Sequence, residues 1–247
     1  MLNLFTFLPA VFKVLGVYKQ YNKKHLPEIA AAREAGDYET ERALIMRETG
    51  VWATEVSKRL KISYVIEGEE NIPESGPIMV YANHQSLLDI VSVFYLFRNH
   101  FQMGFIAKEE WRKLKPLAEA IEYTRSLFLI RDNPREALKV VGQCAELLKE
   151  GFSITIFPEG TRSRGHEMGN FQMASFKFAE KAGVPILPVT LDGGYHVLEE
   201  YDSFKPNQTI RVRVHPLVHI EKMDKAERKQ AFEDVVESIR KGLDEGE

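Results

Sequence analysis

The chain has 247 residues, of which 44% are hydrophobic and 28% charged, so it can bury a large core and is not a disordered chain. Its net charge of -3, with no basic run interleaved with aromatic residues, argues against a nucleic-acid-binding protein. The single cysteine, Cys144, excludes an internal disulfide framework and a zinc site built on several cysteines, and its helical surroundings predict a small core residue.

Residues 1–18 form an almost wholly apolar segment, and basic residues follow between Lys19 and His25. No basic region precedes the segment and no small-residue cleavage site follows it, so the pattern does not fit a signal peptide. Its length is at the lower limit for a membrane span, and Pro9 and Lys13 weaken that interpretation. We therefore expect an interfacial helix whose basic cluster faces anionic headgroups. A core helix packed on the domain is the alternative.

A second helix is predicted over residues 37–60, with Ile45, Trp52 and Val56 along one apolar face. The two helices could form an amphipathic hairpin. We accordingly divide the chain into an N-terminal membrane-associated helical hairpin, residues 1–60, and an α/β domain, residues 61–247.

From Ile62 onward, strand patterns and helix patterns alternate. Short apolar stretches predict strands over residues 62–66, 78–82, 104–107, 127–130, 153–157, 186–191 and 210–215. Longer patterns predict helices over residues 86–98, 134–150, 171–182 and 225–241. This alternation predicts an α/β fold with a mostly parallel sheet flanked by helices.

The stretch from Asn83 to Asp89 lies where one strand should end and a helix begin. Residues five apart in an ideal helix lie about 140° from each other, so His84 must precede the helix if it is to meet Asp89. With Ser86 as the N-cap, the imidazole can fold back toward the carboxylate, which would hold one ring N–H and leave the other nitrogen basic. The alternative is a capping box in which Asp89 only satisfies backbone N–H groups.

Two more polar clusters follow predicted strands. Arg131 ends one strand beside the helix start at Asn133, where backbone N–H groups favour an anion such as phosphate; a surface salt bridge is the alternative. Residues 157–163 follow the next strand, and there Gly160 permits close backbone approach while Arg162 supplies positive charge. We expect a phosphate-bearing ligand at this loop, although Pro-x-Gly turns are common.

These stretches resemble, in order, the four motifs of the glycerolipid acyltransferases, in particular the 1-acylglycerol-3-phosphate acyltransferases. The matching residues are Asn83-His84-x4-Asp89, the strand ending in Arg131, Phe157-Pro158-Glu159-Gly160-Thr161-Arg162-Ser163 and Val184-Pro185-Ile186-Leu187-Pro188, with Ala107-Lys108-Glu109-Glu110 similar to a further family stretch. The chain departs from the family at Arg125-Ser126, where relatives usually carry a glycine, and at Phe171-Gln172-Met173-Ala174, where Phe-Lys-x-Gly is common.

The resemblance implies transfer of a fatty acyl group from acyl carrier protein or coenzyme A to the sn-2 hydroxyl of lysophosphatidic acid, giving phosphatidic acid in phospholipid biosynthesis. It implies His84 and Asp89 as the catalytic pair. The implied substrate-binding residues are Lys108, Arg131, Glu159, Gly160, Thr161 and Arg162. No metal ion and no bound cofactor are implied. Together with the N-terminal pattern, it implies a monotopic enzyme on the phospholipid surface at the cytoplasmic face of the cell membrane.

Three alternatives remain at this stage. The first is an acyltransferase of the same family that acts on glycerol 3-phosphate or another lysophospholipid. The second is a serine esterase with Ser86 as nucleophile, although the chain lacks a Gly-x-Ser-x-Gly elbow at that position. The third is a membrane-binding module without enzymatic activity, which leaves the polar clusters unexplained.

Overall fold

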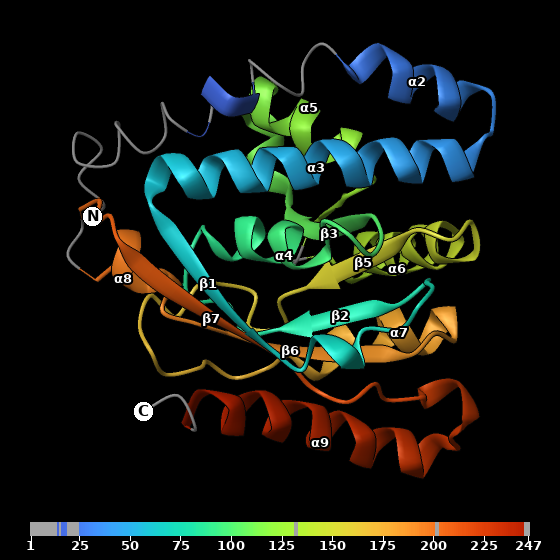
Figure 1. Cartoon of the computed structure of the whole chain (residues 1–247). Coiled ribbons are helices and arrows are strands. Elements are labelled where there is room, and N and C mark those ends of the chain that lie inside the picture. The colour runs from blue at the N-terminus through green and yellow to red at the C-terminus, as the bar shows by residue number, and fades with distance from the viewer. Residues whose placement is uncertain (1–13, 15, 19–24, 131–132, 201–202, 245–247) are drawn as a thin grey trace.

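A mixed sheet forms the centre of the computed structural model, which describes residues 14, 16–18, 25–130, 133–200 and 203–244 (Figure 1). Its strands are β1 (Ile62–Glu67), β2 (Met79–Ala82), β3 (Met103–Lys108), β4 (Leu127–Leu129), β5 (Ser153–Ile156), β6 (Ile186–Asp192) and β7 (Gln208–Val214). They are ordered β1-β7-β6-β2-β5-β3-β4, and every neighbouring pair is parallel except β6 with β7. The carboxyl ends of β2, β3, β4, β5 and β6 therefore lie along one edge of the sheet.

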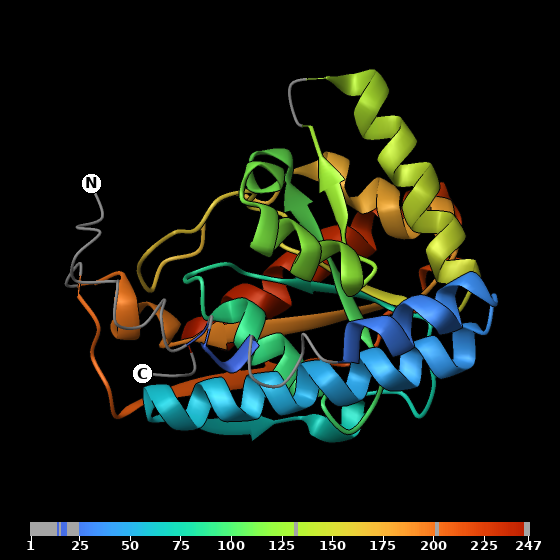
Figure 2. The ribbon, with the colours of Figure 1, turned by 90° about the horizontal axis from the view of Figure 1, so that it is seen from above.

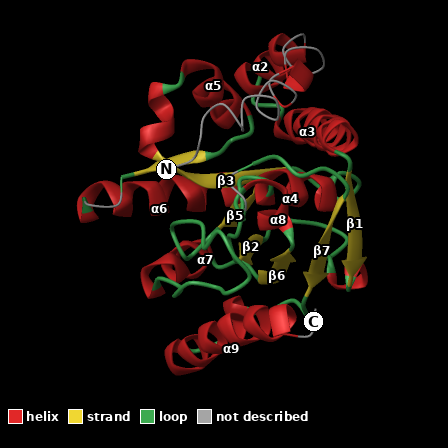
Figure 3. Cartoon of the chain, turned by 90° about the vertical axis from the view of Figure 1, so that its left-hand side faces the viewer, coloured by secondary structure: helices red, strands yellow, loops and turns green. Residues whose placement is uncertain are grey.

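Helices cover both faces of this sheet. The described α-helices are α2 (Leu26–Glu34), α3 (Tyr38–Leu60), α4 (Asp89–Phe97), α5 (Lys115–Tyr123), α6 (Pro134–Lys149), α7 (Lys177–Ala182), α8 (Gly194–Leu198) and α9 (Lys225–Asp244). Short 3-10 helices span Glu69–Asn71, Glu109–Lys113, Met173–Phe176 and Ile220–Lys222. Figure 3 shows α3 and α9 on opposite sides of the sheet.

Each face of the sheet has its own hydrophobic core. On one face, α3 and α4 pack on the sheet through residues such as Val56, Val93 and Leu96. On the other, α6, α7 and α9 bury Cys144, Phe178 and their neighbours. As predicted, Cys144 is a buried core residue, and burial raises the pKa of its thiol to about 12. The inner strands β2, β5 and β6 are buried almost throughout because both faces of the sheet are covered there, whereas β7 alternates buried and partly exposed residues.

The predicted fold class is confirmed, with small differences in the elements. α4 begins at Asp89 rather than at Ser86, and the predicted helix over residues 171–182 is divided into Met173–Phe176 and α7. α5 was not predicted, because Pro116 follows its first residue and a charged 3-10 turn precedes it. The division of the chain into two domains at residue 60 stays a prediction.

An N-terminal helical hairpin is present, and its two described arms are α2 and α3, which lie side by side (Figure 2). The helix predicted over residues 1–18 falls mostly outside the described residues. Along the described part of the chain, no helix combines the length and the apolar character that crossing a bilayer requires.

A buried ion-pair cluster joins this hairpin to the loop before β4. The carboxylate of Glu41 is fully buried and accepts two hydrogen bonds of 2.7 Å from Arg125 and one of 2.8 Å from Arg33. Arg125 has a φ of 61°, which is strained for a residue with a side chain. The bidentate contact to Glu41 stabilises that backbone conformation and holds α3 against the start of β4.

We predict that Glu41→Gln lowers the free energy of unfolding by about 2 to 4 kcal/mol, because two arginine charges lose their carboxylate at a site closed to water. The partial exposure of both arginines keeps the loss below that of a fully buried pair. Urea unfolding followed by circular dichroism measures this change in the free energy of unfolding. The control is Glu39→Gln, an exposed position on the same turn of α3, expected to shift stability by less than about 0.5 kcal/mol. Equal midpoints for the two variants would contradict the prediction.

Candidate active site

Most of the predicted site residues gather at the carboxyl edge of the sheet, where the loops after β2, β5 and β6 meet. The first loop, residues 83–88, carries His84 and leads into α4. The second, residues 157–172, carries Glu159 and Arg162. The third leads from β6 into α8. Parallel neighbouring strands bring these loops together, and Gln85 and Gly193 contact each other although 108 residues separate them in sequence.

His84 and Asp89 form a hydrogen-bonded pair, as the spacing predicted. His84 Nδ1 lies 2.8 Å from Asp89 Oδ2, and Asp89 is fully buried while the His84 side chain is 15% exposed. Because a carboxylate can only accept, Nδ1 carries the hydrogen and Nε2 keeps its lone pair. Nε2 makes no hydrogen bond to any described residue. The pair thus presents one basic nitrogen whose orientation the carboxylate fixes.

Aromatic rings hold the imidazole from one side. The His84 ring stacks on Phe157 with 4.2 Å between ring centroids and 13° between planes. Phe105 stacks in turn on Phe157 at 5.9 Å. This stack runs from β2 across β5 to β3. It limits rotation of the imidazole and keeps one of its faces out of water.

Two other polar side chains of the first loop bind the end of β6 and the residue that follows it. Asn83 receives a hydrogen bond from the backbone N–H of Leu191 and donates one to the Leu191 carbonyl, both at 2.8 Å. Gln85 donates to Asp192 and accepts from the backbone N–H of Gly193, both at 3.1 Å. Both side chains are fully buried. These bonds fix the backbone on either side of His84.

The prediction that Ser86 is the N-cap of the helix is wrong. α4 begins at Asp89, the N-cap position is Leu88, and no side chain caps it. The Ser86 hydroxyl instead donates to Glu199 at 2.7 Å, and Asp89 Oδ2 accepts the Ser86 backbone N–H at 2.8 Å. The Ser86 oxygen also accepts the backbone N–H of Leu88 at 3.1 Å, so the hydroxyl caps the turn that precedes α4 and not the helix itself. Because Ser86 is fully buried and donates to the Glu199 carboxylate, the arrangement does not fit a nucleophilic serine.

The loop after β5 is bound to the first loop through Glu159. Glu159 Oε1 accepts the backbone N–H of His84 at 2.6 Å, and Oε2 accepts that of Gly169 at 2.8 Å. Burial raises the pKa of the Glu159 carboxyl, and these two hydrogen bonds oppose the shift. The backbone N–H of Ser163 also donates to the His84 carbonyl at 2.8 Å. Glu159 thus positions the His84 backbone, while a contact with substrate stays a prediction.

Arg162 belongs to the same loop and binds a residue that sequence reasoning missed. Its Nη1 donates to Glu199 Oε1 at 2.8 Å. Glu199 is also the residue that accepts from the Ser86 hydroxyl and, at 3.1 Å, from the Leu87 backbone N–H. Nothing in the sequence around Glu199 distinguishes it from the adjacent glutamate. Burial raises the pKa of the Glu199 carboxyl, against the effect of its hydrogen bonds and of the Arg162 charge.

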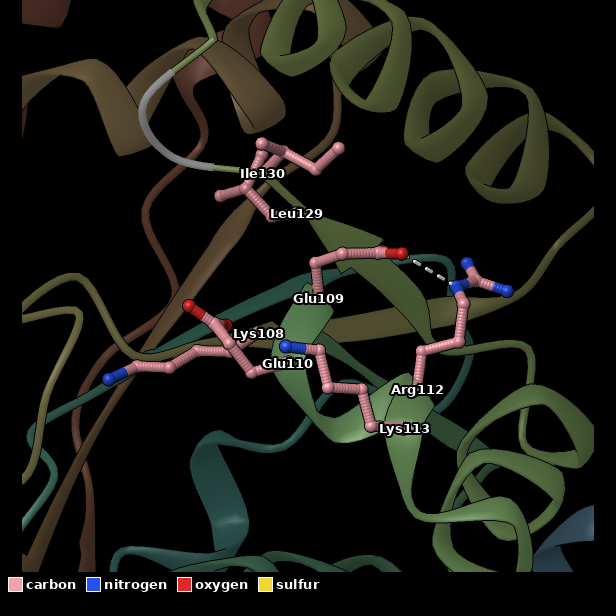
Figure 4. Close-up of a pocket in the computed structure, with 7 residues that line it drawn as sticks. All are labelled: Lys108, Glu109, Glu110, Arg112, Lys113, Leu129 and Ile130. Atoms are coloured by element: carbon pink, nitrogen blue, oxygen red, sulfur yellow. Dashed lines mark hydrogen bonds and ion pairs between the residues drawn. The ribbon is translucent and has the colours of Figure 1, made fainter.

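The remaining predicted residues lie around this centre. Gly160, with a φ of 72°, and the exposed Thr161 continue the Glu159 loop. Lys108 lies instead in a neighbouring pocket of about 560 Å³ at the ends of β3 and β4, lined by Lys108, Glu109, Glu110, Arg112, Lys113, Leu129 and Ile130 (Figure 4). One strand separates β3 from β2, so the pocket starts about 10 Å along the sheet from the first loop. Arg131 directly follows the pocket-lining Ile130 but lies outside the described residues.

No cluster of three or more His, Cys, Asp or Glu side chains suited to a metal ion occurs among the residues that the structure describes.

Comparisons with known proteins agree on one family. Residues 63–192 match the model of the family described as Acyltransferase. The chloroplastic 1-acyl-sn-glycerol-3-phosphate acyltransferase of Arabidopsis thaliana is 35% identical over 161 residues, which cover 64% of this chain and 44% of that protein. The 1-acyl-sn-glycerol-3-phosphate acyltransferase of Borreliella burgdorferi is 29% identical over 183 residues, 74% of this chain and 72% of that one.

A solved structure is similar over nearly the whole chain. The crystal structure of the 1-acyl-sn-glycerophosphate acyltransferase PlsC from Thermotoga maritima has a TM-score of 0.77 and 28% sequence identity, and the match covers 99% of this chain and 97% of that one. This chain nevertheless spans less than half the length of the plant relatives that it matches.

Proposed function

Because this chain belongs to the acyltransferase family, we propose that it moves a fatty acyl group from a thioester to the sn-2 hydroxyl of lysophosphatidic acid, giving phosphatidic acid. The acyl donor is acyl carrier protein or coenzyme A carrying the fatty acid. The observation that carries the proposal is the hydrogen bond between His84 Nδ1 and Asp89 Oδ2, which leaves Nε2 as a base at the sheet edge. The names of the Arabidopsis and Borreliella relatives support the acceptor.

In the proposed reaction, His84 Nε2 takes the proton of the acceptor hydroxyl as its oxygen attacks the thioester carbonyl. A C–O bond forms and the C–S bond breaks. The imidazolium then gives its proton to the leaving thiolate. Asp89 keeps Nδ1 protonated and stabilises the imidazolium, so His84 acts first as base and then as acid. This route needs no acyl-enzyme, which agrees with the buried state of the Ser86 hydroxyl.

The acceptor's phosphate and glycerol would be bound by basic residues on both sides of His84. Arg131 follows β4 in the sequence, and Lys108 lines the pocket at the ends of β3 and β4 together with Arg112 and Lys113. Glu159, Gly160, Thr161 and Arg162 form the other side, and Arg162 is the cation among them. Guanidinium groups suit a phosphate because they present several N–H donors in one plane.

The substrates also suggest where the enzyme works. Lysophosphatidic acid and phosphatidic acid reside in the bilayer, so an enzyme attached to the phospholipid surface meets its acceptor there. The apolar residues 1–18 and the basic cluster after them are the proposed attachment, at the cytoplasmic face of the membrane. The proposed reaction uses no metal ion and no bound cofactor.

One assay tests the proposed function. Purified protein in detergent is incubated with acyl-CoA or acyl-carrier-protein donors and with lysophosphatidic acid, other lysophospholipids or glycerol 3-phosphate. Free thiol and lipid product are then measured together. Equal amounts of thiol and phosphatidic acid support the proposal. Preference for another acceptor would identify a different member of the family, whereas thiol release without acylated lipid would indicate a thioesterase.

The first activity prediction compares the two members of the histidine–aspartate pair. His84→Ala removes the base and should lower the turnover number by about 10² to 10⁴-fold. Asp89→Asn keeps the shape but loses the charge that supports the imidazolium, so we expect a partial to large loss, smaller than that of His84→Ala. Wild-type turnover in a folded His84→Ala variant would show that the proposed mechanism is wrong.

The second activity prediction concerns Arg131 as a residue that binds the phosphate of the acceptor. A charge-assisted contact to phosphate contributes roughly 1.5 to 3 kcal/mol, so Arg131→Ala should lower catalytic efficiency on lysophosphatidic acid by about ten- to a hundredfold. With a monoacylglycerol, which lacks the phosphate, the loss should be much smaller. Arg135→Ala, an exposed arginine one turn further along the chain, is the matched control. Similar losses on both acceptors would point to a structural role for Arg131.

The third prediction of the proposed function concerns attachment to the membrane. Deleting residues 1–24 removes ten leucine, valine and phenylalanine side chains. Val14 and Val17 pack on the core that α3 and α4 share with the sheet, and each of the others contributes up to about 1.5 to 3 kcal/mol when taken out of water. The truncated protein should therefore no longer sediment with liposomes, and its activity on long-chain donors should fall more than on short-chain ones. High salt should weaken binding of the full chain only in part, since it screens the basic cluster alone. A folded truncation that still sediments would assign the segment to the protein core.

A further inference from the structure

Glu199 joins two parts of the site that are distant in sequence. It follows α8 directly, and its side chain is fully shielded from solvent. One carboxylate oxygen accepts from the Ser86 hydroxyl, and the other accepts from the Leu87 backbone N–H and from Arg162 Nη1. The same carboxylate therefore fixes the loop that carries His84 and the arginine of the neighbouring loop.

The fold brings Glu199 to this position through two glycines at the start of α8. Gly193 has a φ of 89° and donates its N–H to Gln85. A Cβ on Gly194 would lie 3.0 Å from Asp89 Oδ1 and 3.2 Å from the Ser86 Cβ. α8 thus packs against the loop so closely that a side chain at position 194 would force its neighbours to move by a few tenths of an ångström. The segment is built to hold Glu199 within reach of Ser86 and Arg162.

Arg162 keeps most of its hydrogen-bonding capacity in this arrangement. A guanidinium carries five N–H groups, and the contact with Glu199 uses one of them. Among the described residues, Glu199 is the partner of this guanidinium. The side chain is 17% exposed, so part of the group faces solvent. An anion that enters the site can bind the remaining N–H groups while Glu199 holds the other edge.

We propose that Glu199 is a positioning residue that holds the Arg162 guanidinium in the orientation needed to bind the acceptor's phosphate. This inference rests on the proposed function for the identity of the acceptor. Glu199 acts through Arg162 and makes no contact with substrate. A neutral side chain of the same shape holds Arg162 with a weaker hydrogen bond. The guanidinium then has the binding orientation in a smaller fraction of molecules, and the affinity for the acceptor falls in proportion to that fraction.

The test is a double-mutant cycle in acceptor binding. The dissociation constant of a short-chain lysophosphatidic acid, below its micelle concentration, is measured by titration calorimetry for the wild type, Glu199→Gln, Arg162→Ala and the double variant. We expect Glu199→Gln to raise the constant about tenfold and Arg162→Ala to raise it at least as much. The double variant should bind no more weakly than Arg162→Ala, because Glu199 then has no guanidinium to hold.

Two controls separate positioning from a general structural role. Glu200→Gln alters the adjacent glutamate, which is exposed and pairs with His196 outside this network, and should leave binding within about twofold of wild type. Binding of a monoacylglycerol of the same chain length should not change in Glu199→Gln, because that ligand lacks the phosphate. If Glu199→Gln does not fold, Glu199→Asp replaces it in the test. This variant keeps the negative charge, but its side chain is one methylene shorter, so the carboxylate lies farther from the Arg162 guanidinium.

Three results would overturn the inference. The first is wild-type binding of lysophosphatidic acid by Glu199→Gln. The second is a double variant that loses the product of the two single effects, which means that the residues act independently. The third is a wild type that does not bind lysophosphatidic acid. Turnover is measured separately on the same proteins: binding with the expected coupling but without acyl transfer would refute the proposed function and leave the positioning role in place.

Discussion

The site depends on burying the polar loop after β2. Asn83, Gln85, Ser86 and Asp89 are all fully buried, and the loop has no regular secondary structure to satisfy its backbone. A buried N–H without an acceptor costs about 1 to 3 kcal/mol, so each needs a partner. Three carboxylates meet this need: Glu159 accepts from the N–H of residue 84, Asp89 from that of residue 86 and Glu199 from that of residue 87. They belong to three different segments, and this requirement determines where those segments must lie around His84.

The same carboxylates explain why the loops after β5 and β6 approach so closely. Glu159 accepts from the His84 backbone with one oxygen and from Gly169 with the other, and a Cβ on Gly169 would lie 2.8 Å from Glu159 Oε2. At the start of α8, Gly194 allows a comparable approach to Ser86, since its Cβ would lie 3.2 Å from that of Ser86. Phe157 fills the space beside the imidazole. Hydrogen bonds and ring stacking thus fix the direction in which His84 presents Nε2, before any substrate binds.

Local patterns predicted the elements well and the long-range polar contacts poorly. The apolar runs that became β1 to β7, and the Asn133-Pro134 start of α6, are signals read within a few residues. The meeting of His84 with Asp89 could also be predicted, because only five positions separate them. Ser86 was misread because its partner, Glu199, lies 113 residues further along the chain. Arg125 was recognised as a departure from the family, yet its partner Glu41, 84 residues earlier, carries no local signal. The sequence around a glutamate does not show whether its carboxylate will be buried, because the residues that bury it come from distant parts of the chain.

Burying these carboxylates also affects stability. The pKa of Glu159 and that of Glu199 are both raised, chiefly by burial, and the Asp89 charge adds to each shift. A carboxyl group with a raised pKa in the folded state favours folding most when it is protonated, and that contribution is lost as pH rises through the folded pKa. In their ionised form these buried carboxyl groups therefore favour folding less than in their protonated form, and the two apolar cores on either face of the sheet offset the difference. Replacing these carboxylates by apolar residues would relieve that burden, but it would leave the backbone N–H groups of the His84 loop and the Arg162 guanidinium without acceptors. The position of His84 is thus maintained at the expense of stability.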